Sequence, residues 1–334
     1  MSAEPANGTR DLIVVGCSAG GVEALPRLLA PLPKDLPAAL VVVQHMGASN
    51  NPMLVDILRR SSLLPVSWAD QGARIERSHV YVCPPDTHLL FNGDHIRLTS
   101  GPRENHARPS IDKLFRSAAA EHSSRVVGVL LTGMLDDGVS GLLEIQKAGG
   151  IVIIQDPEDA AYPELPSRAL QAVEPDRVLP ITAIPTALSM ICAQPRGLPG
   201  VSRALALEAE VDRQGSVDPA SLHSLGPQTP IACPDCSGPT WLIGDENTRR
   251  YRCYLGHVSS ARELLVQQSL EVEAALWSAV RALHERAMTL ETLAADADRV
   301  GSNGVGDLYA QRAKETRIQA ELARKFLVEV IKPT

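Results

Sequence analysis

The chain contains few aromatic residues, no long hydrophobic run and no cluster of basic residues. Phe, Trp and Tyr make up 3% of its 334 residues, which leaves too few rings for a surface that stacks nucleic-acid bases. The formal net charge of −7 also argues against binding to nucleic acid or to an anionic membrane surface. The apolar run LIVVGC near the N-terminus is too short for a signal peptide or a membrane span. We therefore expect a cytoplasmic protein that neither binds nucleic acid nor inserts into a membrane.

The six cysteines fall into two groups, and neither group suggests disulfide bridges. Cys17, Cys83 and Cys192 are scattered among apolar neighbours and are expected to be buried thiols. The other three cysteines lie close together in the C-terminal half of the chain, in a spacing typical of metal sites. Both groups fit a reducing compartment such as the cytoplasm.

Residues 11 to about 193 alternate short apolar runs with amphipathic segments. Runs of this length without polar alternation are typical of strands that are buried on both faces of a sheet. We therefore predict an α/β fold with a doubly wound, mostly parallel sheet. The stretch THLLFNGDHIRLT (87–99) predicts a β-hairpin at or beyond the sheet edge, because an Asn-Gly-Asp turn separates two alternating runs. The apolar runs are LIVVG (12–16), ALVVVQ (39–44), HVYVC (79–83), VVGVLLTG (126–133) and GIVIIQ (150–155).

The rest of the chain differs in composition from this region. Pro, Gly, Ser and charged residues dominate 195–229, which predicts a linker with one short helix. Two long segments with helical spacing, separated by GSNGVGD, predict an antiparallel helical hairpin. The expected divisions are a disordered leader (1–10), an α/β domain (11–194), the linker (195–229), a small Cys/His module (230–258) and the helical hairpin (259–334).

Ser18 lies at the end of the first apolar run, within GCSAG. This sequence matches the G-x-S-x-G pattern of a nucleophile elbow, in which a sharp turn lifts the serine hydroxyl above the strand ends. Backbone N–H groups at the start of the following helix can then stabilise an oxyanion. Glycine-rich strand-to-helix turns also bind phosphate groups, so the pattern alone leaves both interpretations open.

Two further strands are expected to bring a histidine and an aspartate to the same sheet edge. His45 directly follows VVVQ, and Asp136 and Asp137 follow the strand that ends in LLTG. Each has a plain alternative, namely a hydrogen-bonded histidine or an aspartate that caps a helix. Three strands that deliver Ser, His and Asp to one edge nevertheless favour a catalytic triad. The chain order Ser–His–Asp differs from that of α/β-hydrolases, which disfavours a general lipase or peptidase.

Several segments, in the same order, resemble the catalytic domain of the CheB family, the bacterial chemotaxis protein-glutamate methylesterases. The resemblance implies a hydrolase that cleaves glutamyl methyl esters on chemoreceptor helices, and many family members also deamidate receptor glutamines. It implies no cofactor for catalysis. The matching segments, within residues 11 to about 192, are VVGCSAGGVEAL, VVVQHM, VYVCPPDTHLL, RPSIDKLFRSAA, LLTGMLDDGVSGL and, less closely, QDPEDAAYPELPSRAL.

The family's catalytic motif carries over onto three residues of this sequence. It implies Ser18 as the nucleophile, His45 as the general base and Asp137 as the carboxylate that orients the histidine. Asp137 is implied rather than Asp136 because the family's acid stands immediately before a glycine. The implied reaction transfers the acyl group to Ser18 and then hydrolyses the acyl-enzyme.

Three further residues are expected near the substrate. By geometry and analogy, the backbone N–H groups near Ala19 and Met134 are candidate oxyanion donors. Family members often have a hydroxyl residue where Ala19 stands, so only the backbone of Ala19 is available. Arg108 is expected either to hold the substrate loop or to form a structural ion pair.

The resemblance also suggests partners. The expected partner is a methyl-accepting receptor or a similar helical signalling protein, onto which the C-terminal hairpin docks. The hairpin's apolar stripe is alternatively explained by self-packing or by formation of a homo-oligomer. Family members usually carry a receiver domain ahead of the catalytic domain, and with the nucleophile at position 18 we expect none here and a different regulation. The alternative function is a non-catalytic signalling adaptor, which the intact Ser, His and Asp disfavour.

The segments CPDC and CYLGH supply three cysteines and a histidine. Cys233, Cys236, Cys253 and His257 form a Cys₃His set suited to tetrahedral, structural zinc. A segment of this length with few apolar residues needs a bound metal ion to fold. The alternatives are a CxxC redox pair and a ribbon that has lost its metal.

Overall fold

A computed structural model describes residues 8–46, 53–215, 218–244 and 246–330. The chain divides into two compact units, Met1–Glu263 and Leu264–Thr334, which are described separately. Most of the expected leader lies outside the described residues. Its last residues, 8–10, form backbone and side-chain hydrogen bonds with Pro195 and Arg196.

The first unit is built around a seven-stranded sheet in which every neighbouring pair of strands is parallel. This confirms the predicted α/β fold with a doubly wound sheet. The strand order is β3-β4-β2-β1-β7-β8-β9. The strands are β1 (Leu12–Cys17), β2 (Ala39–Gln44), β3 (Val66–Trp68), β4 (Val80–Val82), β7 (Val126–Leu130), β8 (Ile151–Gln155) and β9 (Arg177–Leu179).

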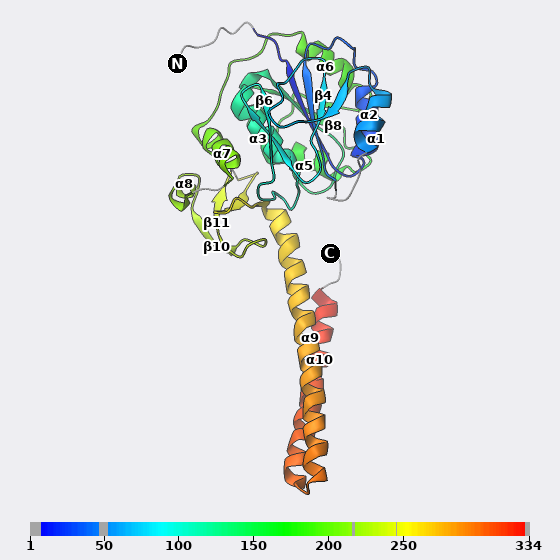
Figure 1. Ribbon diagram of the computed structural model, residues 1–334, viewed down its shortest axis with the longest axis vertical. Coiled ribbons are helices and arrows are strands. Elements are labelled where there is room, and N and C mark those ends of the chain that lie inside the picture. The colour runs from blue at the N-terminus through cyan, green and yellow to red at the C-terminus, as the bar shows by residue number, and fades with distance from the viewer. Residues whose placement is uncertain (1–7, 47–52, 216–217, 245, 331–334) are drawn as a thin grey trace. The chain divides into compact units, whose positions relative to one another are not determined.

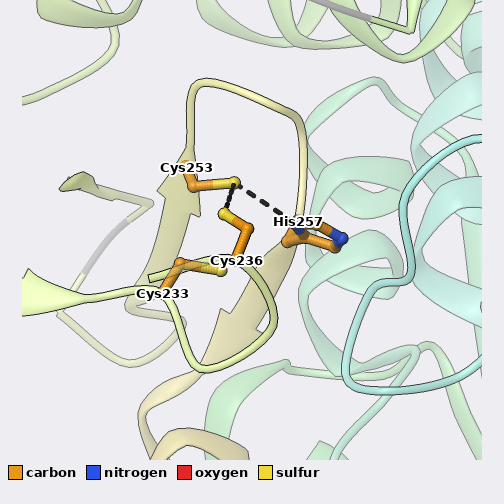
Figure 2. Close-up of side chains that lie close together, drawn as sticks. All are labelled: Cys233, Cys236, Cys253 and His257. Atoms are coloured by element: carbon orange, nitrogen blue, oxygen red, sulfur yellow. Dashed lines mark hydrogen bonds between the residues drawn. The ribbon is translucent and has the colours of Figure 1, made fainter. Parts of the chain in front are cut away.

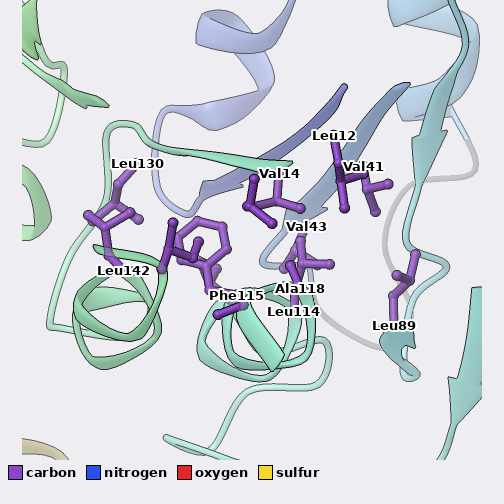
Figure 3. Close-up of a cluster of buried hydrophobic side chains, with 14 of the residues drawn as sticks. Leu12, Val14, Val41, Val43, Leu89, Leu114, Phe115, Ala118, Leu130 and Leu142 are labelled. Atoms are coloured by element: carbon purple, nitrogen blue, oxygen red, sulfur yellow. The ribbon is translucent and has the colours of Figure 1, made fainter. Parts of the chain in front are cut away.

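Helices cover both faces of this sheet (Figure 1). Because side chains alternate along a strand, Leu12 and Val14 of β1 face one hydrophobic cluster, while Ile13 and Val15 face another. The first cluster includes Phe115 and is drawn in Figure 3. Its helices are α3 (Ile111–His122), α4 (Val139–Lys147) and α5 (Glu164–Ala172), and those of the other face are α1 (Gly21–Leu29), α2 (Met53–Ser61) and α6 (Ile184–Cys192).

The predicted β-hairpin is present as a separate two-stranded sheet. It consists of β5 (His88–Asn92) and β6 (His95–Thr99), which pair antiparallel. Gly93 in the connecting turn has a φ of 53°, a conformation that favours glycine. A short 3₁₀ turn, η1 (Ser123–Arg125), leads from α3 into β7.

The stretch 195–229, expected as a linker, contains two helices. They are α7 (Arg203–Gln214), capped by the Ser202 hydroxyl, and α8 (Pro219–His223). The inner face of α7 buries two acidic residues, Glu208 and Asp212, beside apolar Leu205. Acidic residues usually lie on the solvent-exposed face of a helix, so the composition of this stretch predicted a linker and not a packed helix.

A four-stranded antiparallel sheet follows, which we call the ribbon. Its strands are β10 (Gln228–Ala232), β11 (Pro239–Ile243), β12 (Arg250–Cys253) and β13 (Val258–Ser260), in that order. The ribbon belongs to the first unit, since Val258 pairs with Glu104 and Arg103 of the α/β domain.

The second unit is the predicted helical hairpin. It is formed by α9 (Ala261–Arg299), whose first residues belong to the first unit, and α10 (Asn303–Val330). The two helices share an alanine-rich seam, and Arg317 pairs with Glu291 across them at 2.7 Å. The buried alanines are Ala287, Ala294, Ala297, Ala313 and Ala320. Within the described residues, no helix is long and apolar enough to cross a membrane.

Candidate active site

Ser18 lies in the tight turn between β1 and α1. Its backbone N–H donates to Thr132 O at 3.0 Å, and its carbonyl accepts from Gly21 N at 3.0 Å. Gly20 has a φ of 79°, and a Cβ on Gly21 would overlap the side chain of Gln44. The turn therefore requires both glycines, as expected for an elbow that exposes its serine.

His45 stands at the end of β2, directly beside Ser18. Its backbone N–H donates to Cys17 O at 3.0 Å, because β1 and β2 are neighbouring parallel strands. The imidazole Nδ1 lies 3.2 Å from Ser18 Oγ, and Nε2 lies 2.7 Å from Asp137 Oδ2. The three side chains thus form a continuous hydrogen-bonded chain that reaches a half-buried serine.

Asp137 follows β7 and is buried at the N-terminus of α3. Its carboxylate accepts from Ile111 N at 2.7 Å, from Ser110 Oγ at 2.9 Å and from Asn105 Nδ2 at 3.0 Å. Burial alone would raise its pKa, but the hydrogen bonds from His45, Ile111 N and Asn105 lower the pKa below its usual value. The positive end of the α3 dipole acts in the same direction.

The charge on Asp137 determines which nitrogen of His45 carries the proton. An ionised carboxylate only accepts hydrogen bonds, so the short contact requires a proton on Nε2. Nδ1 then presents its lone pair to the Ser18 hydroxyl. This arrangement suits proton transfer from serine to histidine.

Asp136, the adjacent acid, is in a different environment. Its Oδ1 accepts from Ser260 Oγ at 2.8 Å, at the start of α9. Burial raises its pKa, and the nearby charge of Asp137 adds to this effect. The two neighbouring aspartates therefore face different segments, and Asp137 alone of the two is hydrogen-bonded to His45.

The candidate oxyanion donors flank Ser18. A Cβ built on Gly133 would lie 3.0 Å from Ser18 Cβ, so the loop that carries Met134 passes close to the serine. Within the part of the chain that the structure describes, neither the N–H of Ala19 nor that of Met134 donates a hydrogen bond. Both groups are available to a substrate oxygen.

Arg108 forms an ion pair instead of pointing freely into the site. Its Nη2 lies 2.8 Å from Asp86 Oδ1, and its Nη1 donates to the carbonyls of Ser100 and Gly101. It still lines a cavity of about 430 Å³ together with His45. The guanidinium of Arg108 therefore stabilises the wall of this cavity.

Ser110 and Asn105 both donate to Asp137, and neither was predicted from the sequence. Ser110 had a detectable signal, since it stands in RPSIDKLF and caps α3 by accepting from Lys113 N. Asn105 had none, because it lies outside the helices and strands and its partners Asp137 and Ser260 are far from it in the chain.

The four expected metal ligands lie together in the ribbon (Figure 2). Their ligand atoms are all within 4.8 Å of one another, with Cys236 Sγ 3.7 Å from Cys253 Sγ and His257 Nδ1 3.4 Å from Cys253 Sγ. A tetrahedral ion with metal–sulfur bonds of about 2.3 Å holds its ligands about 3.8 Å apart. The donor set and its spacing therefore fit one tetrahedral metal ion. All six cysteines are free thiols, which excludes disulfides in this structure.

Comparison with known proteins identifies the family of the α/β domain. The CheB methylesterase family matches residues 13–188, more than half of the chain. A relative from Photorhabdus laumondii, named protein-glutamate methylesterase/protein-glutamine glutaminase, is 40% identical over 185 residues, or 54% of this chain and 53% of that protein. One from Geobacter metallireducens with the same two activities in its name is 37% identical over 184 residues, with similar coverage. The chain thus spans about half the length of these relatives.

A solved structure gives the same result. The crystal structure of the Thermotoga maritima CheB methylesterase catalytic domain superposes with a TM-score of 0.53 at 33% sequence identity. It covers 55% of this chain and 98% of that domain. The family match, residues 13–188, includes Ser18, His45 and Asp137 and all of the seven-stranded sheet except Leu12. This chain belongs to the CheB methylesterase family.

Proposed function

We propose that this chain is a protein-glutamate methylesterase that acts through Ser18, His45 and Asp137. The observation that carries the proposal is the hydrogen-bonded chain Ser18 Oγ–His45 Nδ1 and His45 Nε2–Asp137 Oδ2. The activities named for the relatives support the choice of substrate, a glutamyl methyl ester. Deamidation of a glutamine by the same groups is part of the proposal.

The first half of the reaction forms an acyl-enzyme. Ser18 Oγ attacks the ester carbonyl while His45 Nδ1 takes the hydroxyl proton. The N–H groups of Ala19 and Met134 stabilise the oxyanion of the tetrahedral intermediate. The C–O bond to the methoxy group then breaks, and His45 gives its proton to the leaving methanol.

The second half repeats these steps with water. His45 Nδ1 takes a proton from water as the water oxygen attacks the glutamyl ester on Ser18. When the intermediate collapses, the bond to Ser18 Oγ breaks, His45 returns the proton to Oγ, and the glutamate side chain of the substrate protein is released. Asp137 stabilises the imidazolium at both stages, because its carboxylate stays ionised and bonded to Nε2. A glutamine substrate would release ammonia in place of methanol.

The proposed substrate is a methyl-accepting receptor or a similar helical signalling protein of the cytoplasm. The hairpin of the second unit supports this choice, since several large apolar side chains on it are exposed and are available to a helical partner. They are Leu265, Leu270, Trp277, Ile318, Leu322 and Phe326. Self-association of the chain through the same residues is the competing explanation.

We also propose that the ribbon binds zinc in a structural role. Cys233, Cys236, Cys253 and His257 would hold the ion, and the four protein ligands leave no open position for a substrate. Substituting Cys233→Ser is expected to abolish stoichiometric zinc in the purified protein, as measured by metal analysis. Full retention of zinc would rule out this ligand set.

The test of the esterase is methanol release from a methyl-labelled receptor. Ser18→Ala is expected to abolish release, because no other group takes the place of the nucleophile. Ser61→Ala is the matched control, since that hydroxyl bonds only to carbonyls of its own helix α2. Equal release by wild type and Ser18→Ala would refute the enzyme, and receptor binding without any release would support the signalling adaptor.

A further inference from the structure

A tight turn supplies one of the hydrogen bonds to the candidate triad. Glu104 and Ala107 exchange backbone hydrogen bonds, and the two residues between them, Asn105 and His106, have φ values of 49° and 54°. Positive φ at both central positions is typical of a type I′ turn, which favours asparagine. We call residues 104–107 the support turn.

Four hydrogen bonds fix Asn105 in the support turn. Its backbone N–H donates to Val258 O at 2.8 Å, and its Oδ1 accepts from Ser260 N at 2.8 Å. Its Nδ2 can then point only toward the acids, and it donates to Asp137 Oδ1 at 3.0 Å and to Asp112 Oδ2 at 3.3 Å. The side-chain amide is therefore oriented by β13 of the ribbon and acts on Asp137.

Both halves of the Cys/His cluster contact the support turn. β13 begins at Val258, the residue after the candidate ligand His257. Asp235, which lies between Cys233 and Cys236, pairs with His106 at 3.5 Å. A metal ion that ties the two halves of the cluster together would thus fix both sides of the turn.

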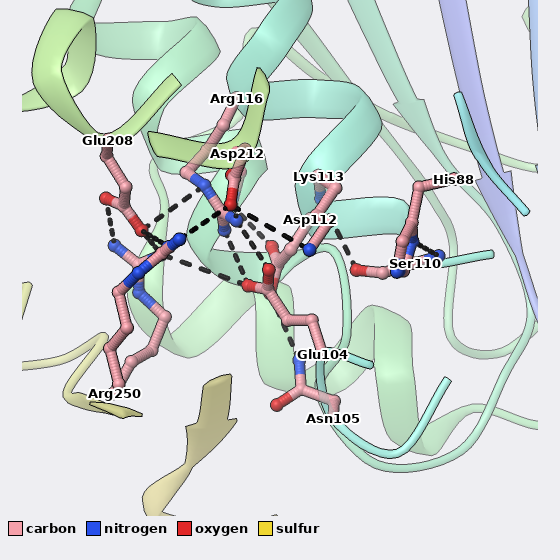
Figure 4. A network of polar contacts seen from close by, with 12 residues as sticks. His88, Glu104, Asn105, Ser110, Asp112, Lys113, Arg116, Glu208, Asp212 and Arg250 are labelled. Carbon is pink, nitrogen blue, oxygen red and sulfur yellow. Dashed lines mark hydrogen bonds and ion pairs between the residues drawn. The ribbon is translucent and has the colours of Figure 1, made fainter. Parts of the chain in front are cut away.

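Buried ion pairs also attach the support turn to the α/β domain. The fully buried Glu104 receives a bidentate pair from Arg116 of α3, at 2.6 and 2.5 Å (Figure 4). Arg116 also pairs with Asp212 of α7 at 3.0 Å. Breaking a buried pair leaves an uncompensated charge, so the turn is strongly held on this side.

The ribbon joins the same network through β12. Arg250 pairs with Glu208 at 2.6 Å, and Arg252 pairs with Asp212 at 3.0 Å, all four being buried. These residues lie on the ribbon and on α7, and Figure 4 follows the chain of contacts from Arg250 to Asn105. The ribbon therefore packs against the rest of the first unit and is not a separate module joined only by a linker.

We infer that Asn105 is a positioning residue for Asp137 and that the Cys/His ribbon, when it holds its metal, keeps Asn105 in place. This inference rests on the proposed esterase function. Asn105 touches no reacting atom; it fixes Asp137, which orients His45. The kcat of the triad therefore depends on a folded, metal-bound ribbon, although all three triad residues lie in the α/β domain.

The first test is Asn105→Ala in the full chain. Removing a hydrogen bond to a charged group is expected to lower kcat about 10- to 100-fold, with little change in KM. The loss of kcat without a change in KM is the readout that separates positioning of Asp137 from a loss of substrate binding. Rates are divided by the number of serines that a fluorophosphonate labels, so that unfolded protein does not count.

Asn92→Ala is the matched control for this truncation, since Asn92 is an exposed residue of the β5–β6 hairpin. It is expected to leave kcat and KM unchanged. Wild-type kcat per labelled serine in Asn105→Ala would overturn the inference. Such a result leaves Ser18 as the proposed nucleophile, whereas wild-type methanol release by Ser18→Ala refutes that role.

The second test removes the metal. The zinc-loaded chain and the same chain after chelation, together with Cys236→Ser, are compared by hydrogen exchange of a peptide covering residues 103–107. Loss of zinc is expected to speed exchange there, because the Asn105 N–H bonds to Val258 O, and to lower kcat. In the Asn105→Ala background, chelation is expected to lower kcat no further. Zinc loss that changes neither exchange nor kcat, or failure of the chain to bind Zn²⁺, would overturn the role of the ribbon.

Discussion

Asp136 and Asp137 are adjacent in the chain but differ in every side-chain contact. Asp137 accepts from His45 and from the start of α3, and its pKa is lowered although burial opposes this. Asp136 accepts from Ser260, and burial raises its pKa. At the scale of single residues, two neighbours in the chain therefore have different roles. Asp137 is an ionised group that orients His45, and Asp136 is an acid that anchors the ribbon.

Asp137→Asn is expected to lower kcat by about 10⁴-fold, the scale known for the orienting carboxylate of a serine triad. The amide cannot stabilise the imidazolium, and its NH₂ group can hold His45 in the wrong tautomer. Methanol release per fluorophosphonate-labelled serine measures the effect. Asp136→Asn is the control, and an equal loss in both variants would contradict the assignment of Asp137.

At the scale of elements, α7 shows how buried charge joins segments. Its Glu208 and Asp212 face arginines from α3 and β12, and all of these side chains are buried. Burial alone would raise the pKa of both acids, but the arginines lower it below the usual values of 4.5 and 3.8. The helix is thus held by buried ion pairs in addition to the apolar contacts of Leu205, Ala209 and Val211.

The ion pairs of α7 predict a loss of stability in acid. An acid whose pKa is lowered by folding stabilises the fold above its unfolded pKa, and this contribution disappears as the pH falls through the folded pKa. The free energy of unfolding, measured in urea, is therefore expected to decrease from about pH 5 downward. Asp112 opposes this trend, because burial and the charges of Asp137 and Glu104 raise its pKa.

Asp212→Asn is expected to cost about 3–5 kcal/mol at pH 7, because Arg116 and Arg252 lose a buried partner. The variant should also show a shallower decrease of stability in acid than the wild type. Asp218→Asn is the matched control, since Asp218 is exposed. An identical pH dependence in wild type and Asp212→Asn would contradict the proposed role of this pair.

At the scale of the whole molecule, two units are covalently joined through α9. The first contains the candidate triad and the ribbon, and the second is a hairpin with an alanine-rich seam and exposed apolar side chains. Small residues predominate in the seam, which also buries Val280 and Leu327, and they let the two helices approach closely.

Removing residues 273–334 tests what the hairpin contributes. The shortened chain is expected to hydrolyse a small methyl ester at the wild-type rate and to lose activity on the whole methylated receptor, because the docking surface is gone. Methanol release from both substrates measures this. Light scattering distinguishes the competing explanation: a wild-type dimer that becomes a monomer, with receptor activity unchanged, would favour self-association.

Much of the site could be predicted from local patterns. Continuous apolar runs predicted strands buried on both faces, and glycines marked the elbow at Ser18. The parallel order then placed the residues after β1, β2 and β7 at one edge, which brought Ser18, His45 and Asp137 together. The Cys/His spacing likewise predicted a cluster that the structure contains.

The tertiary structure decided what depends on partners far apart in the chain. Asn105 bonds to Ser260, 155 residues away, and Arg116 bonds to Asp212, 96 residues away. Hydrophobic periodicity is a local property and can be read from neighbouring letters, whereas the choice of a buried charge partner is made only when elements pack. The sequence by itself therefore determined the sheet, the edge that carries the candidate triad and the Cys/His cluster, and packing decided that the cluster reaches Asp137 through Asn105.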